Sequence, residues 1–485
     1  MMQFVTLICG FVLPRLILES YGSEVNGLTQ SIKQFLGVIA FLELGVGQVI
    51  QSSLYKPLAQ KDTEQISKIL VSGNRFFRNI ARVLLVYVCA LIIVFPFLGE
   101  QDFGWAYTAT LILAMCISSF AQYYFGIIDN LLLNADQKGY IQYISQIVLI
   151  LLNTIVSVWM IREGYSIQSV KLISSLLFLI RPIIVRYYIR QNYQINRKIQ
   201  YIGEPIRQKW NGIAQHVATI VLEGTDSIVL TIFATLSDVS VYSVYYMVIA
   251  GVLALYQSLT AGIQSVVGAL WAKQQIDRLK KVFSMIEMAL HFLTIFMFSC
   301  VALLIVPFVQ VYTNGLTDAN YIKPVFAYVL VIAYTVRCLR TPYNILILAG
   351  GHYKQTQKCH IIAAVLNIVI SIAAVSLWGL IGIAMGTLVA LAYQTGWMMV
   401  YDSKHLLCWS FKNIIKQLSI DAVTMGLIFA IAGWIKLGEI SYIGWFFMAM
   451  PVALIALSVT VIMAMLFYRR TMLEVISAFV RKIKK

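Results

Sequence analysis

Apolar residues in this chain gather into long continuous runs, and short polar stretches separate the runs. A helix that crosses a bilayer needs about 20 mostly apolar residues, whereas the strands of a membrane barrel alternate every second residue. The pattern therefore predicts an all-α polytopic membrane protein with about 14 transmembrane helices. The expected helices cover residues 2–20, 25–54, 83–99, 104–128, 139–161, 166–186, 211–235, 241–270, 285–310, 321–349, 356–376, 379–401, 415–436 and 441–468.

Composition agrees with this pattern. Of the 485 residues, 60% are hydrophobic and 12% are charged, and the mean hydropathy is +0.80. Soluble domains carry about 25% charged residues, so most of this surface is expected to face lipid. The net charge of +16 would suggest nucleic acid in a soluble protein. Here the basic residues occupy the gaps between apolar runs, which is typical of cytoplasmic loops, and we expect no nucleic-acid partner.

The distribution of lysine and arginine predicts the orientation. If the N-terminus is cytoplasmic, 28 basic residues of the loops and the C-terminal tail fall on the inner side. Only Arg162, Lys323 and Lys436 fall on the outer side. Basic loop residues mark the cytoplasmic side, so we expect both termini to be cytoplasmic.

A weak internal repeat divides the chain. Ser23-Glu24-Val25 recurs as Ser237-Asp238-Val239, and Ile50-Gln51-Ser52 recurs as Ile263-Gln264-Ser265, at offsets of 214 and 213 residues. Six helices separate the two copies, so both copies should have the same orientation, as in transporters built from parallel repeats. We expect an N-terminal lobe over 1–190, a basic cytoplasmic linker over 191–210 and a C-terminal lobe over 211–402. Two additional helices and a basic cytoplasmic tail would fill 403–485.

Several basic residues fall inside the expected helices, where a charge is costly and is a functional hypothesis by default. Arg337 and Arg340 are three residues apart on one helix, which Pro342 should kink. Pairing with carboxylates or lipid headgroups would explain each residue equally well. The alternative is a cationic cavity, because guanidinium groups bind phosphate in a bidentate way. The candidate substrate-binding residues are Arg15, Lys33, Arg181, Arg337 and Arg340.

Carboxylates inside the helices are candidates for ion coupling. Glu43, Glu223 and Asp226 are the deepest, and Asp421 lies in a later helix. A carboxylate in a medium of low dielectric constant can carry a proton or Na⁺, although it can equally serve as the structural partner of a basic residue. We favour Asp226, which shares a helix face with Glu223 so that the two could hold one proton between them.

Signatures of catalysis are missing from the sequence. It contains no G-x-x-x-x-G-K-[ST] loop and no H-E-x-x-H motif, and its five histidines show no metal-ligand spacing. We therefore expect no enzyme activity, no catalytic residues, no bound metal and no cofactor other than a coupled H⁺ or Na⁺.

Several segments carry a family resemblance. They are Gly10-Phe11-Val12-Leu13-Pro14-Arg15, Leu42-Glu43-Leu44-Gly45-Val46-Gly47, Ser53-Leu54-Tyr55-Lys56-Pro57-Leu58 and Ala349-Gly350-Gly351-His352-Tyr353-Lys354. In these segments the chain resembles the Wzx-type polysaccharide flippases (O-antigen and capsule exporters) of the MATE-like MOP superfamily. One departure is that the chain begins almost inside its first helix, so the depth of Arg15 depends on where the natural start lies.

The resemblance implies two six-helix lobes around a central cavity and a location in the bacterial cytoplasmic membrane. It implies a flippase that moves a polyprenyl-pyrophosphate-linked oligosaccharide repeat unit by alternating access, for polysaccharide export. The implied partners are the lipid-linked oligosaccharide, membrane lipids, a polysaccharide polymerase and glycosyltransferases.

Three other functions compete with this one. A MATE-type multidrug or cation antiporter would share the fold, but a basic cavity would argue against cationic substrates. A membrane polysaccharide polymerase or glycosyltransferase should have a sizeable external loop with catalytic residues, and all the expected external loops are short. A purely structural scaffold would leave the charges inside the helices unexplained.

The orientation can be tested with a reporter enzyme fused after Lys485. We expect a reporter that works only in the cytoplasm to be active in this fusion, because 28 basic residues lie on the side of the C-terminus. Activity from a reporter that works only outside the cell would overturn the orientation.

Overall fold

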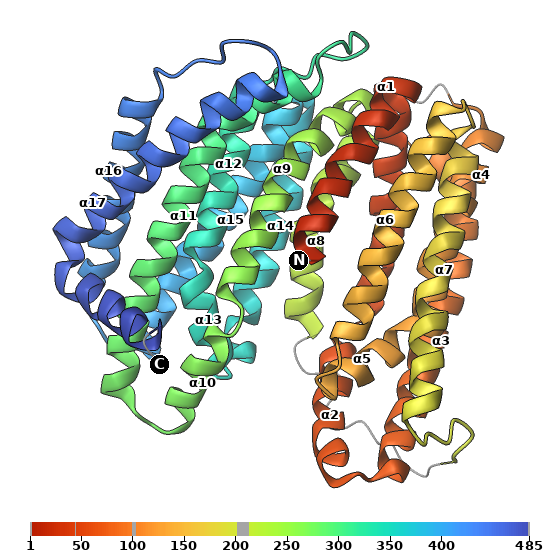
Figure 1. Cartoon of the computed structure of the whole chain (residues 1–485), viewed down its shortest axis with the longest axis horizontal. Coiled ribbons are helices and arrows are strands. Elements are labelled where there is room, and N and C mark those ends of the chain that lie inside the picture. Colours follow the sequence, from red (N-terminus) through yellow and green to blue (C-terminus); the bar gives the residue numbers. More distant parts are fainter. Residues whose placement is uncertain (1, 44, 99–102, 201–212, 484–485) are drawn as a thin grey trace. The chain divides into compact units, whose positions relative to one another are not determined.

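The computed structural model describes residues 2–43, 45–98, 103–200 and 213–483 (Figure 1). Regular structure in these ranges is helical throughout. Among the described residues, twelve helical segments are long and apolar enough to cross a membrane. The segment at Val5–Glu43 contains two helices, and α8 adds a shorter described apolar stretch, Gly224–Phe233. The predicted fold class, an all-α polytopic membrane protein with about 14 spans, is confirmed.

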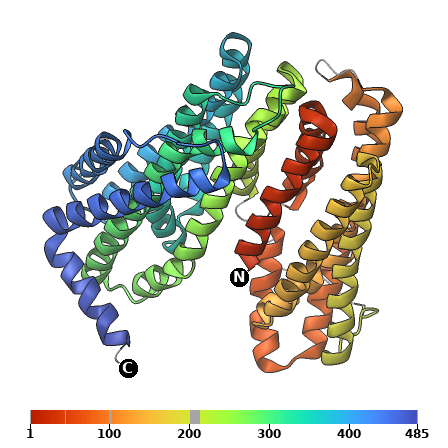
Figure 2. The same ribbon diagram turned by 45° about the horizontal axis from the view of Figure 1, so that its top comes forward.

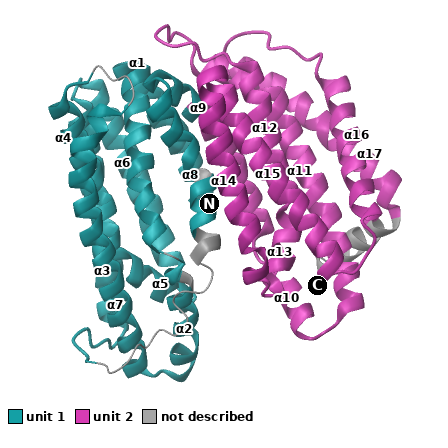
Figure 3. Cartoon of the chain, turned by 180° about the vertical axis from the view of Figure 1, so that it is seen from behind, with its two compact units in different colours: residues 1–243 teal, residues 244–485 magenta. Residues whose placement is uncertain are grey.

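The chain forms two compact units, residues 1–243 and residues 244–485 (Figure 3). The first unit contains α1 Met2–Gly37, η1 Val38–Glu43, α2 Val46–Gln60, α3 Thr63–Val94, η2 Phe95–Phe97, α4 Trp105–Ala121, the π-helix η3 Gln122–Gly126, α5 Ile127–Ala135, α6 Tyr140–Arg162, α7 Ile167–Asn192 and α8 Ile213–Phe233. Helix α9 Leu236–Thr260 includes the boundary between the units. The second unit continues with α10 Ile263–Ala272, α11 Ile276–Tyr312, α12 Pro324–Leu339, α13 Thr341–Ala349, α14 Tyr353–Trp378, α15 Leu380–His405, α16 Lys412–Ala432 and α17 Tyr442–Ile483.

The predicted lobe boundaries at residues 190 and 402 stay predictions. Of the predicted linker, residues 201–210 lie outside the described part of the chain.

Helix α1 is two helices joined at Gly22. The backbone there has a φ of 85° and a ψ of 172°, which glycine adopts without the steric penalty that a Cβ would bring. Gly22 lies between the first two expected helices, 2–20 and 25–54. The second of these is broken again, because η1 ends at Glu43 and α2 begins at Val46.

Helix α3 begins at Thr63, twenty residues before the third expected helix, so the start predicted at residue 83 is wrong. Asp62 caps its N-terminus by accepting a hydrogen bond from the backbone N–H of Gln65 at 2.9 Å. The early part of α3 is amphipathic. Its apolar side, with Ile66 and Leu70, packs into the core of the first unit, and its polar side lowers the average hydropathy.

Within the first unit, α6 packs against α1 and α7, and α7 packs against α4. Figures 1 and 2 show the orange and yellow helices of this unit side by side from both directions. Leu28, Ile32, Leu84, Leu111 and Ile112 are completely buried in its core.

Within the second unit, α15 packs against α12 and α14, and α11 packs against α12, α16 and α17. The contact between α14 and α15 depends on Gly382 and Gly386. A Cβ added at Gly382 would lie 2.3 Å from the carbonyl oxygen of Ala374, and one at Gly386 would lie 2.2 Å from Ser371 Oγ. The four-residue spacing of these two glycines in the sequence predicts a close helix approach, and the structure confirms it.

The helix boundaries repeat along the chain. Helices α11, α14 and α15 begin at Ile276, Tyr353 and Leu380, each 213 residues after the first residue of α3, α6 and α7 respectively. A broken helix occupies the same place in both copies. In the first it is α4, η3 and α5, and in the second it is α12 and α13, which meet at Arg340 with Pro342 in the first turn of α13. The kink expected at Pro342 is confirmed, and the offset of the helices matches that of the sequence repeat.

The Gly386→Ala variant should lower the stability of the second unit. Its methyl group would overlap Ser371, and overpacking of this kind costs about 1–3 kcal/mol. We expect the thermal unfolding midpoint of purified protein to fall by several degrees. Gly396→Ala, on the same helix with no atom within 4 Å of the added Cβ, is the matched control and should unfold as the wild type does. Equal midpoints for the two variants would contradict the packing account.

Candidate anion-binding site

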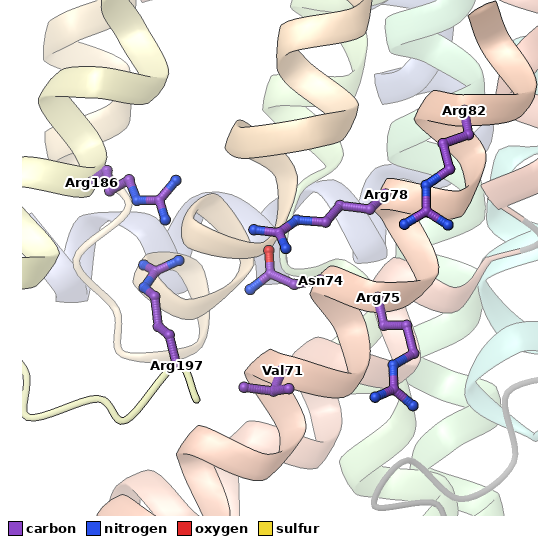
Figure 4. Close-up of a pocket in the computed structure, with 7 residues that line it drawn as sticks. All are labelled: Val71, Asn74, Arg75, Arg78, Arg82, Arg186 and Arg197. Atoms are coloured by element: carbon purple, nitrogen blue, oxygen red, sulfur yellow. The ribbon is translucent and has the colours of Figure 1, made fainter. Parts of the chain in front are cut away.

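A cavity of about 290 Å³ opens in the first unit, and five arginines dominate its lining. Figure 4 shows the guanidinium groups of Arg78, Arg186 and Arg197 turned toward the same space, with Asn74 beside them. The remaining lining residues are Val71, Arg75 and Arg82. We call this cavity the arginine pocket.

Helix α3 supplies three of the arginines. Arg75, Arg78 and Arg82 are spaced at i, i+3 and i+7, so the helical repeat places them along one side of α3. The hydrophobic pattern predicts a cytoplasmic loop over this part of α3, so the three arginines are absent from the predicted site residues. Their helical spacing, following the capping Asp62, is the signal that could have found them.

The segment after α7 brings Arg197 to the pocket. The backbone N–H of Asn196 donates to Ser67 Oγ on α3 at 3.1 Å. Arg197 itself forms a salt bridge of 2.8 Å with Asp129, whose side chain is 1% exposed. These contacts hold the segment against α3 and α5.

A second polar contact anchors the start of the same segment. Tyr193 donates a hydrogen bond to Asp136, and Lys138 Nζ lies 2.8 Å from the same carboxylate oxygen. Burial alone would raise the pKa of Asp136. The hydrogen bonds from Lys138 and Tyr193 lower the pKa by more, so it lies below its ordinary value. Asp136 is therefore a charged anchor that ties the segment to the end of α5.

Positive charge is in excess in the arginine pocket. The guanidinium of Arg78 lies 5.1 Å from the centre of the Tyr124 ring, and that of Arg186 lies 5.9 Å from the centre of the Phe125 ring. Both aromatic residues belong to the π-helix η3. The Nε atoms of Arg78 and Arg186 are buried without a hydrogen-bond partner. An anion with several oxygens would supply the acceptors that these groups lack.

The predicted cationic residues of the first unit occupy separate surroundings. Arg15 pairs with Glu19, one turn further along α1, at 3.3 Å. Lys33 is exposed on the second helix within α1, and its charge acts on that of Lys171 on α7. Arg181 is partly buried on α7, and its Nε has no hydrogen-bond partner.

The other two predicted cationic residues lie in the second unit, at the end of α12. The guanidinium of Arg337 lies 5.8 Å from the centre of the Tyr334 ring. Arg340 is the residue between α12 and α13, and its charge acts on His360. The five residues are thus divided between the units, and their convergence on one cavity stays a prediction.

The three carboxylates predicted to couple transport to an ion lie in the first unit. Glu43 accepts a hydrogen bond from Tyr123 at 2.7 Å. Asp226 is 3% exposed and accepts one from Tyr242 at 2.9 Å. Glu223 lies on α8, and its side chain is outside the described part of the structure. The coupling role of all three stays a prediction.

The fold is shared with solved structures of polytopic helical membrane proteins. The chain is similar to the solved structure of the lipid II flippase MurJ in an inward closed conformation, with a TM-score of 0.71 and 16% identity over 97% of this chain and 98% of that one. It is also similar to an inward-facing MATE family multidrug resistance transporter of the MOP superfamily, with a TM-score of 0.62 and 14% identity over 83% of this chain and 95% of that one. A MOP superfamily transporter from Pyrococcus furiosus, described as having a binding pocket of reverse polarity, gives a TM-score of 0.58 and 13% identity over 83% and 93% of the two chains.

No protein-family model and no curated protein matches the sequence. At these identities the likeness shows the fold alone.

The arginine pocket should bind inorganic pyrophosphate. Titration calorimetry of the purified protein in detergent should show binding that weakens as salt is raised, because exposed charges are screened. Arg78→Gln and Arg186→Gln should each weaken binding about ten- to a hundredfold, since one hydrogen bond to a charged group contributes about 1.5–3 kcal/mol. Arg190→Gln, one turn from Arg186 but outside the pocket lining, is the control and should bind as the wild type does. Equal affinity in all three variants would reject this site.

Proposed function

We propose that this protein is a flippase that moves a polyprenyl-pyrophosphate-linked oligosaccharide across the bacterial cytoplasmic membrane for polysaccharide export. It does so by alternating access, without an enzymatic step of its own. An ion, H⁺ or Na⁺, is exchanged for the substrate. A polysaccharide polymerase and glycosyltransferases work beside it on the same lipid-linked intermediate.

The arginine pocket is the observation that carries this proposal. A pyrophosphate-linked lipid presents several negatively charged oxygens next to an uncharged sugar chain and a hydrocarbon tail. Arginine suits the charged part, because its planar group donates two parallel hydrogen bonds and keeps its charge when partly buried. Three guanidinium groups that face one space fit a ligand with more than one phosphate.

The position of the pocket supports the same substrate. It lies between the first half of α3 and the last turns of α7, which is the end of these helices predicted to face the cytoplasm. A flippase that exports polysaccharide takes its substrate from that side. In this proposal the arginine pocket receives the pyrophosphate first, and the predicted residues Arg15, Lys33, Arg181, Arg337 and Arg340 hold it during passage.

Fold likeness alone leaves two substrate classes open, because one similar protein is a lipid II flippase and others are multidrug transporters. A transporter of cationic drugs needs negative or aromatic groups where its substrate binds. The excess of arginine in the pocket favours an anionic headgroup over a cationic drug.

Reconstitution in lipid vesicles tests the proposal. A fluorescent polyprenyl-pyrophosphate oligosaccharide should move between leaflets faster with the protein than in empty vesicles, as measured by its accessibility to an external quencher. The Arg78→Gln, Arg186→Gln double variant should lose most of this activity, and Arg190→Gln should keep it. An uncharged dolichol-like lipid with the same sugars should not be moved.

Two results would contradict the proposal. One is movement of the uncharged lipid at the same rate as the pyrophosphate-linked one. The other is protein-dependent accumulation of a cationic dye without any movement of the pyrophosphate-linked lipid, which would favour the multidrug antiporter.

A further inference from the structure

Four ionisable side chains are buried together in the second unit. Glu287 and His291 lie one turn apart on α11, Asp402 lies near the end of α15, and Asp421 lies on α16. None of the four is more than 6% exposed. We call these residues the acidic cluster. They are separate from the predicted coupling residues, of which Glu43 and Asp226 each accept a tyrosine hydrogen bond in the first unit.

Three of the four side chains in the acidic cluster, His291, Asp421 and Glu287, form hydrogen bonds. His291 Nδ1 lies 2.6 Å from Asp421 Oδ2, and Gln417 donates to the other oxygen of Asp421 at 2.9 Å. Tyr343 donates to Glu287. Asp421 and Glu287 therefore each have a fixed partner.

Asp402 has no such partner. Its side chain is completely buried, and neither of its carboxylate oxygens has a hydrogen bond. His291 Nε2 is likewise buried without a partner. The charge of Glu287 acts on Asp402, and the charge of Asp402 acts on Tyr343, so the carboxyl group of Asp402 lies near both residues.

Burial of an unpaired carboxylate is too costly to leave it charged. The cluster holds three carboxyl groups and one imidazole, so at most one of its negative charges is balanced from within. Groups this close share protons rather than titrate singly. A proton on Asp402 turns one oxygen into a donor and removes the repulsion with Glu287.

Other titratable groups surround the acidic cluster. The charges of the cluster act on Tyr343 of α13, Tyr401 of α15 and Tyr468 of α17. Lys416 Nζ on α16 lies 5.6 Å from the centre of the Tyr468 ring. Arg340, the residue before α13, acts through its charge on Cys359 and His360 of α14. Among the described residues, neither carboxylate oxygen of Asp402 has a basic side chain as its hydrogen-bond partner.

The repeat gives the acidic cluster a counterpart in the first unit. Glu287 and His291 follow Asn74 and Arg78 of the arginine pocket by 213 residues, the offset at which the helices themselves recur. The place that holds an open cationic pocket in one unit thus holds buried acids in the other. Helices α16 and α17, which lie outside the repeat, pack on α11 at this place and contribute Asp421 and Tyr468.

The ligand that fits this geometry is a proton. Among the described residues, no three histidine, cysteine, aspartate or glutamate side chains converge as metal ligands. A proton needs only one carboxylate oxygen, and Asp402 offers two without partners.

We propose that the acidic cluster binds the proton that is exchanged for substrate, with Asp402 as its acceptor. In one conformation the Asp402 carboxylate takes up a proton to form the carboxylic acid, and in the other the acid releases the proton to the opposite side. The proposal rests on the proposed flippase function for its substrate, but the binding of the proton can be measured without transport.

The first measurement is infrared spectroscopy of the purified protein at neutral pH, in H₂O and D₂O. We expect the carbonyl band of a buried, protonated carboxylic acid, shifted by deuterium. Asp402→Asn should remove this band. Asp277→Asn, an exposed carboxylate at the start of α11, is the control and should keep it. A band that survives Asp402→Asn unchanged would overturn the assignment of Asp402.

The second measurement uses the vesicle assay with an imposed pH difference. Wild-type transport of the pyrophosphate-linked lipid should rise several-fold when protons flow against the direction of the lipid. Asp402→Asn should lose this increase, and Asp277→Asn should show all of it. If Asp402→Asn does not fold, Glu287→Gln provides the same comparison, because it removes the charge that faces Asp402.

The outcomes separate the two proposals. An increase that follows a Na⁺ gradient and ignores pH would overturn the proton in favour of a metal cation. Wild-type transport that responds to neither gradient would overturn the coupling and leave the flippase function standing. Failure to transport any pyrophosphate-linked lipid would overturn the flippase function, and the infrared band would still decide whether Asp402 holds a proton.

Discussion

A charged side chain that leaves water must gain a counter-charge, a hydrogen bond or a proton, and this constraint governs the interior of both units. In the first unit, buried Asp129 is paired with Arg197, and this pair draws the segment after α7 onto the arginine pocket. In the second unit, Asp421 is paired with His291, and this pair joins α16 to α11. Where the protein provides no hydrogen-bond partner, as at the Nε of Arg78 and at the carboxylate of Asp402, an external anion or a proton can complete the site.

The repeat explains why these sites stand at matching positions. Duplicated helices give both units the same frame, because α3 and α11, α6 and α14, and α7 and α15 begin at a constant offset. The side chains at equivalent positions differ between the two units, so that Arg78 in one copy corresponds to His291 in the other. Helices α16 and α17 cover the second copy only, which turns a position that is open in the first unit into a buried one. One frame thereby offers an anion site and a proton site.

Hydropathy predicted the fold class because a spanning helix must be apolar along most of its length. It could not predict the start of α3, where the basic side of an amphipathic helix lowers the average over residues 63–82. The same averaging placed Arg75, Arg78 and Arg82 in a loop and hid the arginine pocket. The acidic cluster could not be predicted from the sequence for a different reason. Glu287, His291 and Asp421 are far apart in the sequence, and only the packing of α16 on α11 brings them together. The close approach at Gly382 and Gly386 was predictable because spacing within one helix determines it.

Photo-crosslinking tests the central claim, that the arginine pocket receives the pyrophosphate group, most directly. A polyprenyl-pyrophosphate sugar with a photoreactive group on the first sugar would be added to the protein in vesicles, and the labelled peptides would be identified by mass spectrometry. The account predicts labelling of the peptides that contain residues 71–82 of α3 and 186–197 around the end of α7, and loss of this labelling when inorganic pyrophosphate is added in excess. Labelling confined to other helices, or labelling of these peptides that pyrophosphate leaves unchanged, would contradict it.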